Sequence, residues 1–175
     1  AVPFEAAPDN MRNFFQTGVS TNNNVSISHA DENGAFRFSG TQLNRRGIVP
    51  TTVLNRNTLQ TSMGKKLFNN RLEFRANAMY VGSGSDNVPN AGYDESSSVM
   101  YSFLWIPRNT PIDDLREYWK PGQENVQQSY VEELWGNNPF LIVNENTNSF
   151  NASRLLGDIN ATYHINERMN IRLRS

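Results

Sequence analysis

The strongest constraint on the fold is a strict alternation of apolar and polar residues that begins at Leu72. In an extended backbone, Leu72, Phe74 and Tyr80 fall on one face, with two alanines between them, while the charged residues Glu73 and Arg75 fall on the other. A helix would scatter these residues around its axis. The pattern therefore predicts a β-strand with one wide apolar face and one charged face.

The same unit occurs twice along the chain. The segment 69–75 is echoed by 166–172, and each follows a short polar turn. Repeated hairpins of this kind are typical of the wall of a transmembrane β-barrel, whose outer surface contacts lipid and whose lumen holds water. We therefore predict an all-β fold of about six or seven antiparallel strands.

The composition excludes several classes of protein. A net charge of −1 and a pI near 6.2 give no basic field that would attract nucleic acid. No segment approaches the ~20 consecutive apolar residues of a membrane helix. The mean hydropathy of −0.62 is neutral, because every second residue of a barrel strand is polar. The absence of cysteine removes disulfides, thiolate metal sites and cysteine nucleophiles.

Two kinds of connection alternate along the chain. Tight polar turns are predicted near Asn33, Asn69 and Asn166, and longer connections near Gly47 and over 83–150. The first tight turn contains an Asn-Gly pair, which readily adopts the positive φ values of short hairpins. Outer-membrane barrels have short periplasmic turns and long outer loops. We therefore expect 83–150 to be a long extracellular loop.

Two other segments are predicted to be irregular or only locally ordered. Prolines at positions 3 and 8 predict a linker over 1–11, followed by a short strand over 12–17. Within the extracellular loop, Thr110 as N-cap and Pro111 at the first helical position predict a short helix that runs to Trp119.

The unpaired edges of the predicted sheet indicate that further strands complete it. Six or seven strands with one face this apolar would leave two unpaired edges, which neither water nor a bilayer tolerates. We therefore expect residues 12–175 to be the first strands of a larger barrel.

The order of several sequence segments resembles one known family. The segments that carry the resemblance are 13–28, 33–39, 47–50, 56–58, 144–148 and 154–157, which together span nearly the whole chain. In this order they resemble the start of the barrel in SusC/RagA-type TonB-dependent transporters of Bacteroidetes.

This resemblance implies a 22-stranded barrel in the outer membrane of a Gram-negative bacterium. It also implies a plug domain before residues 1–11, a SusD-like surface lipoprotein as a lid, and TonB as a partner acting through an N-terminal region. The implied activity is energised import of oligosaccharide or peptide ligands, with no cofactor. The plug and the TonB-contacting region are absent from these 175 residues.

Aromatic residues of the long loop are the main candidates for contact with a ligand or partner. Flat rings stack on sugar faces and are enriched in interface cores. The simpler interpretation is that a segment of this length needs a small core of its own, which the rings would supply. The candidates are Trp105, Tyr118, Trp119, Tyr130 and Trp135, with Phe140 beside them.

Four arginines fall on the polar face of the predicted strands. In a transporter these side chains would line the lumen or pair with carboxylates of the plug, whereas in a soluble sheet they would be solvated. They are Arg37, Arg75, Arg172 and Arg174.

Nothing in the sequence predicts an enzyme or a metal site. His29 and His164 each lie beside a predicted turn, where a solvated histidine is the ordinary explanation. Asp113 and Asp114 lie in a first helical turn, where acidic residues are favoured by the helix dipole. The leading hypothesis is thus a transporter segment, and the alternative is a soluble all-β carbohydrate-binding module whose tryptophans bind sugar.

Overall fold

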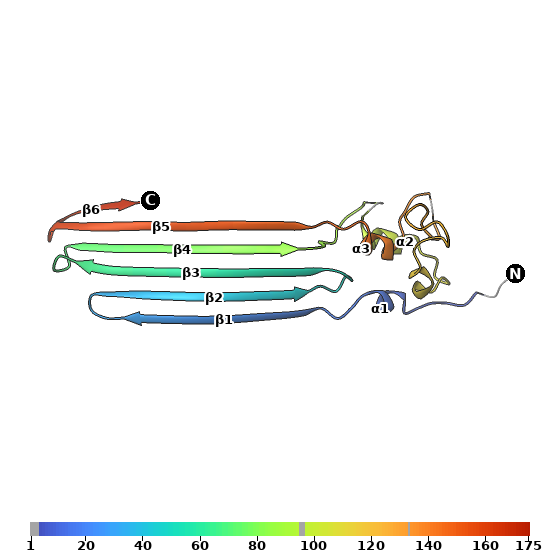
Figure 1. Cartoon of the computed structure of the whole chain (residues 1–175), viewed down its shortest axis with the longest axis horizontal. Helices are drawn as coiled ribbons and strands as arrows, with labels where there is room; N and C mark the ends of the chain where they lie inside the picture. The colour runs from blue at the N-terminus through green and yellow to red at the C-terminus, as the bar shows by residue number, and fades with distance from the viewer. Residues whose placement is uncertain (1–3, 95–96, 133) are drawn as a thin grey trace. The chain divides into compact units, whose positions relative to one another are not determined.

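The computed structural model describes residues 4–94, 97–132 and 134–175, and its main feature is a single antiparallel sheet. The described residues form six strands, which lie in the sheet in sequence order, β1 to β6 (Figure 1). This confirms the all-β prediction. The strands are β1 (Val19–Ala30), β2 (Gly34–Arg46), β3 (Val53–Leu67), β4 (Leu72–Ser85), β5 (Phe150–Asn166) and β6 (Met169–Arg174).

Connections of two lengths alternate between the strands, as the sequence predicts. The turns 31–33, 68–71 and 167–168 are short, whereas β2 and β3 are joined by 47–52 and β4 and β5 by 86–149. Because the strands are antiparallel in sequence order, the short turns share one end of the sheet. We refer to residues 86–149 as the insertion.

The first tight turn differs from the prediction in its backbone. Neither Asn33 nor Gly34 has a positive φ. Instead, the carboxylate of Asp31 accepts hydrogen bonds from the backbone N–H groups of Asn33 and Gly34, each at 2.8 Å, and these bonds lower its pKa. Gly34 is needed for close strand approach: a Cβ atom there would lie 2.5 Å from the carbonyl oxygen of Gly64.

The second tight turn does use left-handed backbone. Phe68, Asn69 and Asn70 have φ values of 53°, 52° and 66°. Asparagine tolerates this region better than other residues with a Cβ atom. The turn predicted near Asn69 is therefore confirmed, and two asparagines explain how it closes.

The chain separates into two compact units. One unit holds most of the sheet, over 21–44, 55–84 and 151–175, and the other holds the described residues of 1–20, 45–54 and 85–150. The insertion contributes α2 (Val99–Trp105), η1 (Ile112–Leu115) and α3 (Pro139–Asn144) to the second unit.

The segment before β1 is a helix rather than the expected strand over 12–17. Helix α1 (Asn10–Phe14) places Phe14 in the core of the second unit, where its ring packs edge-on against Phe103 and Phe140. The residues expected to form a linker are also docked there, since the N–H of Ala7 donates to the carbonyl of Arg108 at 2.8 Å. Packing against the insertion overrides the local signal.

The helix predicted from Pro111 to Trp119 is shorter than expected. Pro111 precedes a single 3-10 turn, Ile112–Leu115, whose two apolar ends are buried in the same core. Residues three apart eclipse in a 3-10 helix, so both side chains can face the core at once. Trp119 lies beyond the helix and forms a β-bridge with Gln128.

The buried hydrophobic core lies in this second unit. Its members come from α1 and from the insertion. This agrees with the interpretation that a connection of this length needs a small hydrophobic core of its own. The core residues are Phe14, Val99, Ile106, Ile112, Leu115, Tyr130, Phe140, Ile142 and Val143.

Candidate functional site

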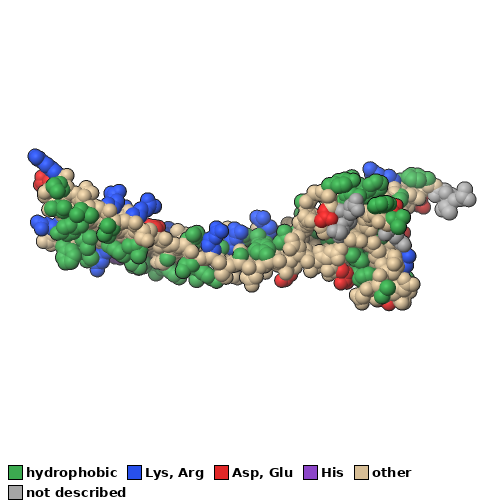
Figure 2. Space-filling model, turned by 90° about the horizontal axis from the view of Figure 1, so that it is seen from above, with side chains coloured by type: hydrophobic (Ala, Val, Ile, Leu, Met, Phe, Trp, Pro, Cys, Tyr) green, Lys and Arg blue, Asp and Glu red, His purple; other side chains and the backbone are tan. Residues whose placement is uncertain are grey.

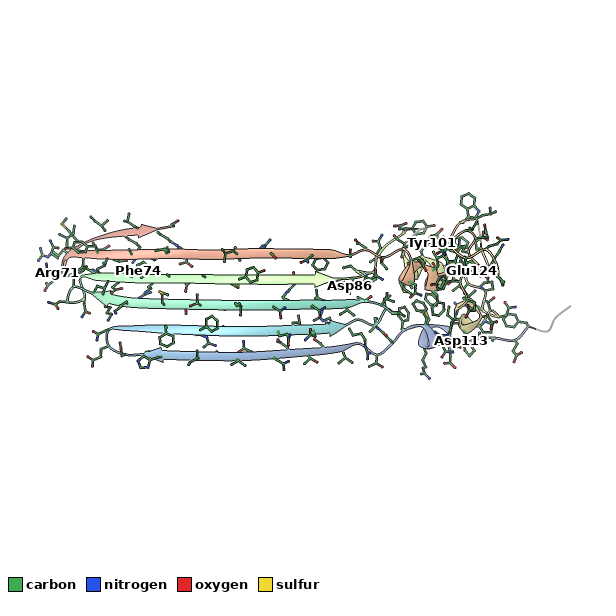
Figure 3. All side chains as sticks on the ribbon, in the orientation of Figure 1. Arg71, Phe74, Asp86, Tyr101, Asp113 and Glu124 are labelled. Atoms are coloured by element: carbon green, nitrogen blue, oxygen red, sulfur yellow. The ribbon has the colours of Figure 1, made fainter. Side chains whose placement is uncertain are left out.

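The register of β3 and β4 separates the sheet unit into an apolar face and a polar face. Leu59 pairs with Tyr80, Met63 with Ala76 and Leu67 with Leu72, which places these six side chains on one face. Phe74, labelled in Figure 3 near the tight-turn end of β4, belongs to this face by the same alternation. The faces predicted from the alternation in β4 are thus confirmed.

The apolar face forms a band of defined height. Between the pair Leu59–Tyr80 and the pair Leu67–Leu72, each strand contributes nine residues. Eight steps of ~3.4 Å span about 27 Å along the strand. Strands β5 and β6 extend the band. Asp158 of β5 accepts a hydrogen bond from Asn77 on the polar face, so Tyr163 and its partner Ile171 fall on the apolar face.

Apolar side chains of this face lie exposed. Phe36 of β2 is among them, because a Cβ atom at Gly40, on the same alternation, would lie 3.6 Å from Leu59 Cδ2. The exposed fractions are 47% for Phe36, 51% for Met63 and 54% for Ile171. Leaving such a side chain in water forgoes about 1.5–3 kcal/mol relative to burying it. Soluble monomers rarely expose contiguous apolar patches of more than a few hundred Å². The band therefore requires a covering of lipid or protein.

The opposite face of the sheet is polar. Arg75 lies opposite Gly64, Arg172 opposite Thr162, and Arg174 opposite Asn160, all turned away from the apolar band. Arg37 follows Phe36 in β2 and so falls on the polar face, where it donates to Ser26 Oγ at 3.4 Å. In Figure 2, which views the sheet edge-on, Lys and Arg side chains stand mainly along one side and hydrophobic side chains mainly along the other.

A small hollow on the polar face gathers two of the four arginines. Its volume is about 120 Å³. Thr162 is the buried residue of its lining, and the Thr162 hydroxyl accepts a hydrogen bond from Arg172 Nε at 3.3 Å. A carboxylate oxygen of Glu73 lies 3.7 Å from Arg75 and the other 3.8 Å from His164 Nε2. These groups can hydrogen-bond a polar ligand. The hollow is lined by Glu73, Arg75, Asn160, Thr162 and Arg172.

The two histidines do not converge on a common site. His29 lies 3.8 Å from Asp31, with its ring beside Phe36, and His164 faces Glu73. Across 4–94, 97–132 and 134–175, no cluster of three His, Asp or Glu side chains could hold a metal ion.

Tyr130 is a core residue rather than an accessible contact residue. Its side chain is buried, and its hydroxyl donates to the carbonyl oxygen of Ser102 at 2.8 Å. Burial raises the pKa of Tyr130 to about 12. For this ring the structure favours the interpretation as a core-forming residue.

Tyr118 and Trp119 are half-buried neighbours in the insertion. Their ring centroids are 5.7 Å apart, and Tyr118 donates its hydroxyl to Glu145 Oε1 at 2.9 Å, which raises the pKa of Tyr118. Trp119 is held by its bridge to Gln128. Contacts within the insertion thus hold the Tyr118 ring and the backbone of Trp119.

Trp105 and Trp135 are the two accessible members of the predicted aromatic set. Trp105 ends α2 and is 49% exposed, with its ring 6.1 Å from that of Tyr101, and Trp135 is 64% exposed. Both remain available to a ligand or a partner protein.

Asn138 has a central structural role that the sequence interpretation missed. It is fully buried, its Nδ2 donates to the carbonyls of Leu115 and Ser129, and its Oδ1 accepts from the N–H of Phe140. The local signal was present, because an asparagine followed by proline is a helix start. The two bonds to distant carbonyls have no local signal.

Comparison with known proteins gives no family assignment: no family model matches the chain, and no curated protein is similar to it. Among the described residues, no helix combines the length and the apolar composition needed to cross a membrane.

Proposed function

We propose that the sheet is an arc of a transmembrane β-barrel in the outer membrane of a Gram-negative bacterium. The observation that carries the proposal is the exposed apolar band from Leu59–Tyr80 to Leu67–Leu72, in a chain whose buried core lies in its other unit. Lipid would cover this band without a second sheet. The polar face, with its arginines, would then line a wet lumen.

The lengths of the strands support this proposal. Transmembrane strands need about 9–11 residues, and the band supplies nine in each of two paired strands. Five strands contain 12 to 17 residues, beyond the 3–10 residues usual in globular proteins. Strands that cross a bilayer and continue beyond it have this length.

The open edges of the sheet favour closure with further strands. Among the described residues, β1 and β6 each pair with one neighbour. An unpaired edge inside a bilayer would leave N–H and C=O groups unsatisfied at a cost of several kcal/mol each. Pairing with strands of the same barrel removes this cost.

The resemblance to SusC/RagA-type transporters gives the barrel its proposed activity, which is TonB-dependent import of oligosaccharide or peptide nutrients. The short turns would face the periplasm and the insertion would lie outside the cell. Ligand would be captured by the insertion with a SusD-like lipoprotein, and movement of a plug driven by TonB would open the lumen. Trp105 and Trp135 are the exposed rings available for capture.

The same exposed tryptophans favour one alternative, a soluble carbohydrate-binding module. Such a module would stack sugar rings on Trp105 or Trp135. It would also have to cover the apolar face of the sheet with a partner protein. The two proposals therefore differ in what contacts Met63 and Phe36.

Single-cysteine labelling tests the barrel directly, since these 175 residues contain no cysteine. A fluorophore on Met63→Cys or Phe36→Cys should be quenched by brominated lipid, and one on Arg75→Cys by aqueous iodide. The protein should also fractionate with outer membranes and change its gel migration on heating in detergent. Aqueous quenching at both Met63 and Arg75 would disprove a lipid-facing band.

A further inference from the structure

The apolar face of the sheet contains a hollow that crosses three strands. Its volume is about 490 Å³, roughly three times that of an engineered ~150 Å³ cavity that holds a benzene ring. It lies within the apolar band, because the pairs Thr61–Ala78 and Met63–Ala76 form part of its lining. Leu155 and Ile159 of β5 are its other apolar walls, and the polar residues Thr61, Asn77, Asp158 and Ser175 also line it.

Small side chains create this hollow. Ala76 and Ala78 form its floor on β4, between larger residues of the neighbouring strands. The glycine at position 157 beside them is explained by strand packing, since a Cβ atom there would lie 3.1 Å from the carbonyl oxygen of Asn77. The two alanines face open space on the apolar side, although alanine is disfavoured in strands. The strand pairing therefore does not explain the choice of alanine.

An apolar hollow of this size favours an apolar occupant. Most of the exposed lining is apolar, so water in the hollow finds few of the two to four hydrogen-bond partners that ordered water makes. Wall atoms that face empty space lose dispersion contacts, which a hydrocarbon chain restores. On the outer surface of a barrel, the available hydrocarbon is the acyl chain of a lipid.

A lysine lies one step from the hollow on the same face. Lys65 pairs with Phe74, between the hollow and the pair Leu67–Leu72 that ends the apolar band. Its side chain is exposed, so the ammonium can extend to the membrane interface. Asp31 of the first tight turn already interacts electrostatically with this ammonium. A headgroup phosphate would add a second negative partner at the same end of the band.

We infer that this hollow is a binding site for one phospholipid, with an acyl chain against Ala76 and Ala78 and the headgroup phosphate at Lys65. The inference rests on the proposed barrel, because a soluble sheet would not meet lipid. The site would hold one lipid at a fixed position on the barrel wall.

Lipid retention by the full-length protein in detergent tests this site. Native mass spectrometry counts the phospholipids that remain after washing in lipid-free detergent. We expect one retained phospholipid for the wild type and at least a fivefold lower retained fraction for Ala76→Leu/Ala78→Leu, because leucines fill the hollow. Lys65→Gln should lower the retained fraction about threefold. Ala161→Leu is the matched control, since it adds leucine to the same face outside the hollow.

Two results would overturn the inference. One is a wild-type protein that changes gel migration on heating, and so is a folded barrel, but retains no phospholipid. The other is a filled variant that retains as much lipid as Ala161→Leu. A protein that neither fractionates with membranes nor changes its migration would instead refute the barrel itself, and the lipid site with it.

Discussion

Asn10 and Ile112 are joined by a hydrogen bond that spans 102 residues of sequence. The Oδ1 atom of Asn10 accepts from the N–H of Ile112 at 2.9 Å, while its Nδ2 donates to the carbonyl of Thr110 at 2.9 Å. One side chain at the start of α1 thus satisfies backbone groups on both sides of Pro111. The segment before β1 is in this way part of the insertion's structure.

Replacing Asn10 should loosen this part of the insertion. Asn10→Ala removes both bonds and leaves the buried N–H of Ile112 without a partner, at a cost of about 1–3 kcal/mol. Trypsin cleavage after Arg108 and Arg116 should become roughly tenfold faster, because local opening precedes cleavage. Asn22→Ala, at an exposed position in β1, is the control. Equal cleavage rates for both variants would contradict the proposed anchoring.

The close approach of Gly34 to Gly64 predicts an asymmetric response to alanine. Gly34→Ala places a Cβ atom 2.5 Å from the carbonyl oxygen of Gly64 and should destabilise the sheet by about 1–3 kcal/mol. Gly64→Ala meets its nearest atoms at 3.8 Å and should be nearly neutral. The urea midpoint of the detergent-folded protein measures both. Equal midpoints for the two variants would show that β2 and β3 can move apart at this contact without loss of stability.

A charge in the middle of the apolar band should block membrane assembly. Met63 lies midway between Leu59 and Leu67, and arginine at the centre of a bilayer costs about 2–4 kcal/mol on a barrel's lipid face. Met63→Arg should therefore reduce the heat-modifiable fraction in outer membranes. Gln60→Arg, exposed on the polar face of the same strand, should assemble normally. Normal assembly of Met63→Arg would mean that the band does not contact lipid.

The buried Tyr130 predicts a loss of stability at high pH. Its pKa is raised to about 12, against an unfolded value of ~10, so above pH 10 the unfolded chain releases a proton that the folded protein retains. The free energy of unfolding should then fall as pH rises from 10 to 12, by up to about 1.4 kcal/mol per pH unit from this residue. Tyr130 is buried in the insertion's core, outside the strands of the band.

Comparison of the wild type with Tyr130→Phe isolates this contribution. The variant loses the bond to the Ser102 carbonyl, which costs about 1 kcal/mol at neutral pH, and its stability should depend less on pH above 10. Urea midpoints at pH 8, 10 and 11.5 measure the difference. Parallel pH profiles would place the Tyr130 hydroxyl in contact with water.

The alternation in β4 shows which part of the fold is local. Side chains of an extended strand alternate between two faces, so the sequence alone predicts that Phe74 and Arg75 lie on opposite faces, and the register of β3 and β4 agrees. The tight turns near Asn33, Asn69 and Asn166 followed from turn-forming residues alone. The polar positions of Arg172 and Arg174 were predicted for the same reason.

In the second unit, tertiary contacts determine the secondary structure before β1 and which aromatic rings are buried. The segment 12–17 was predicted to be a strand, but Phe14 gains a buried site against Phe103 and Phe140 as part of a helix. The role of Tyr130 was likewise undetermined, because an aromatic ring has the same sequence signature in a core as in a ligand site.

The sequence by itself thus determined the strands, their two faces and the alternation of short and long connections, because each depends on residues a few positions apart. Only the tertiary structure decided that Asn10 docks on the insertion, that Tyr130 is buried while Trp135 is exposed, and that Ala76 and Ala78 leave a hollow. Those features depend on side chains brought together from distant segments, and their packing energies exceed the local preferences of the backbone.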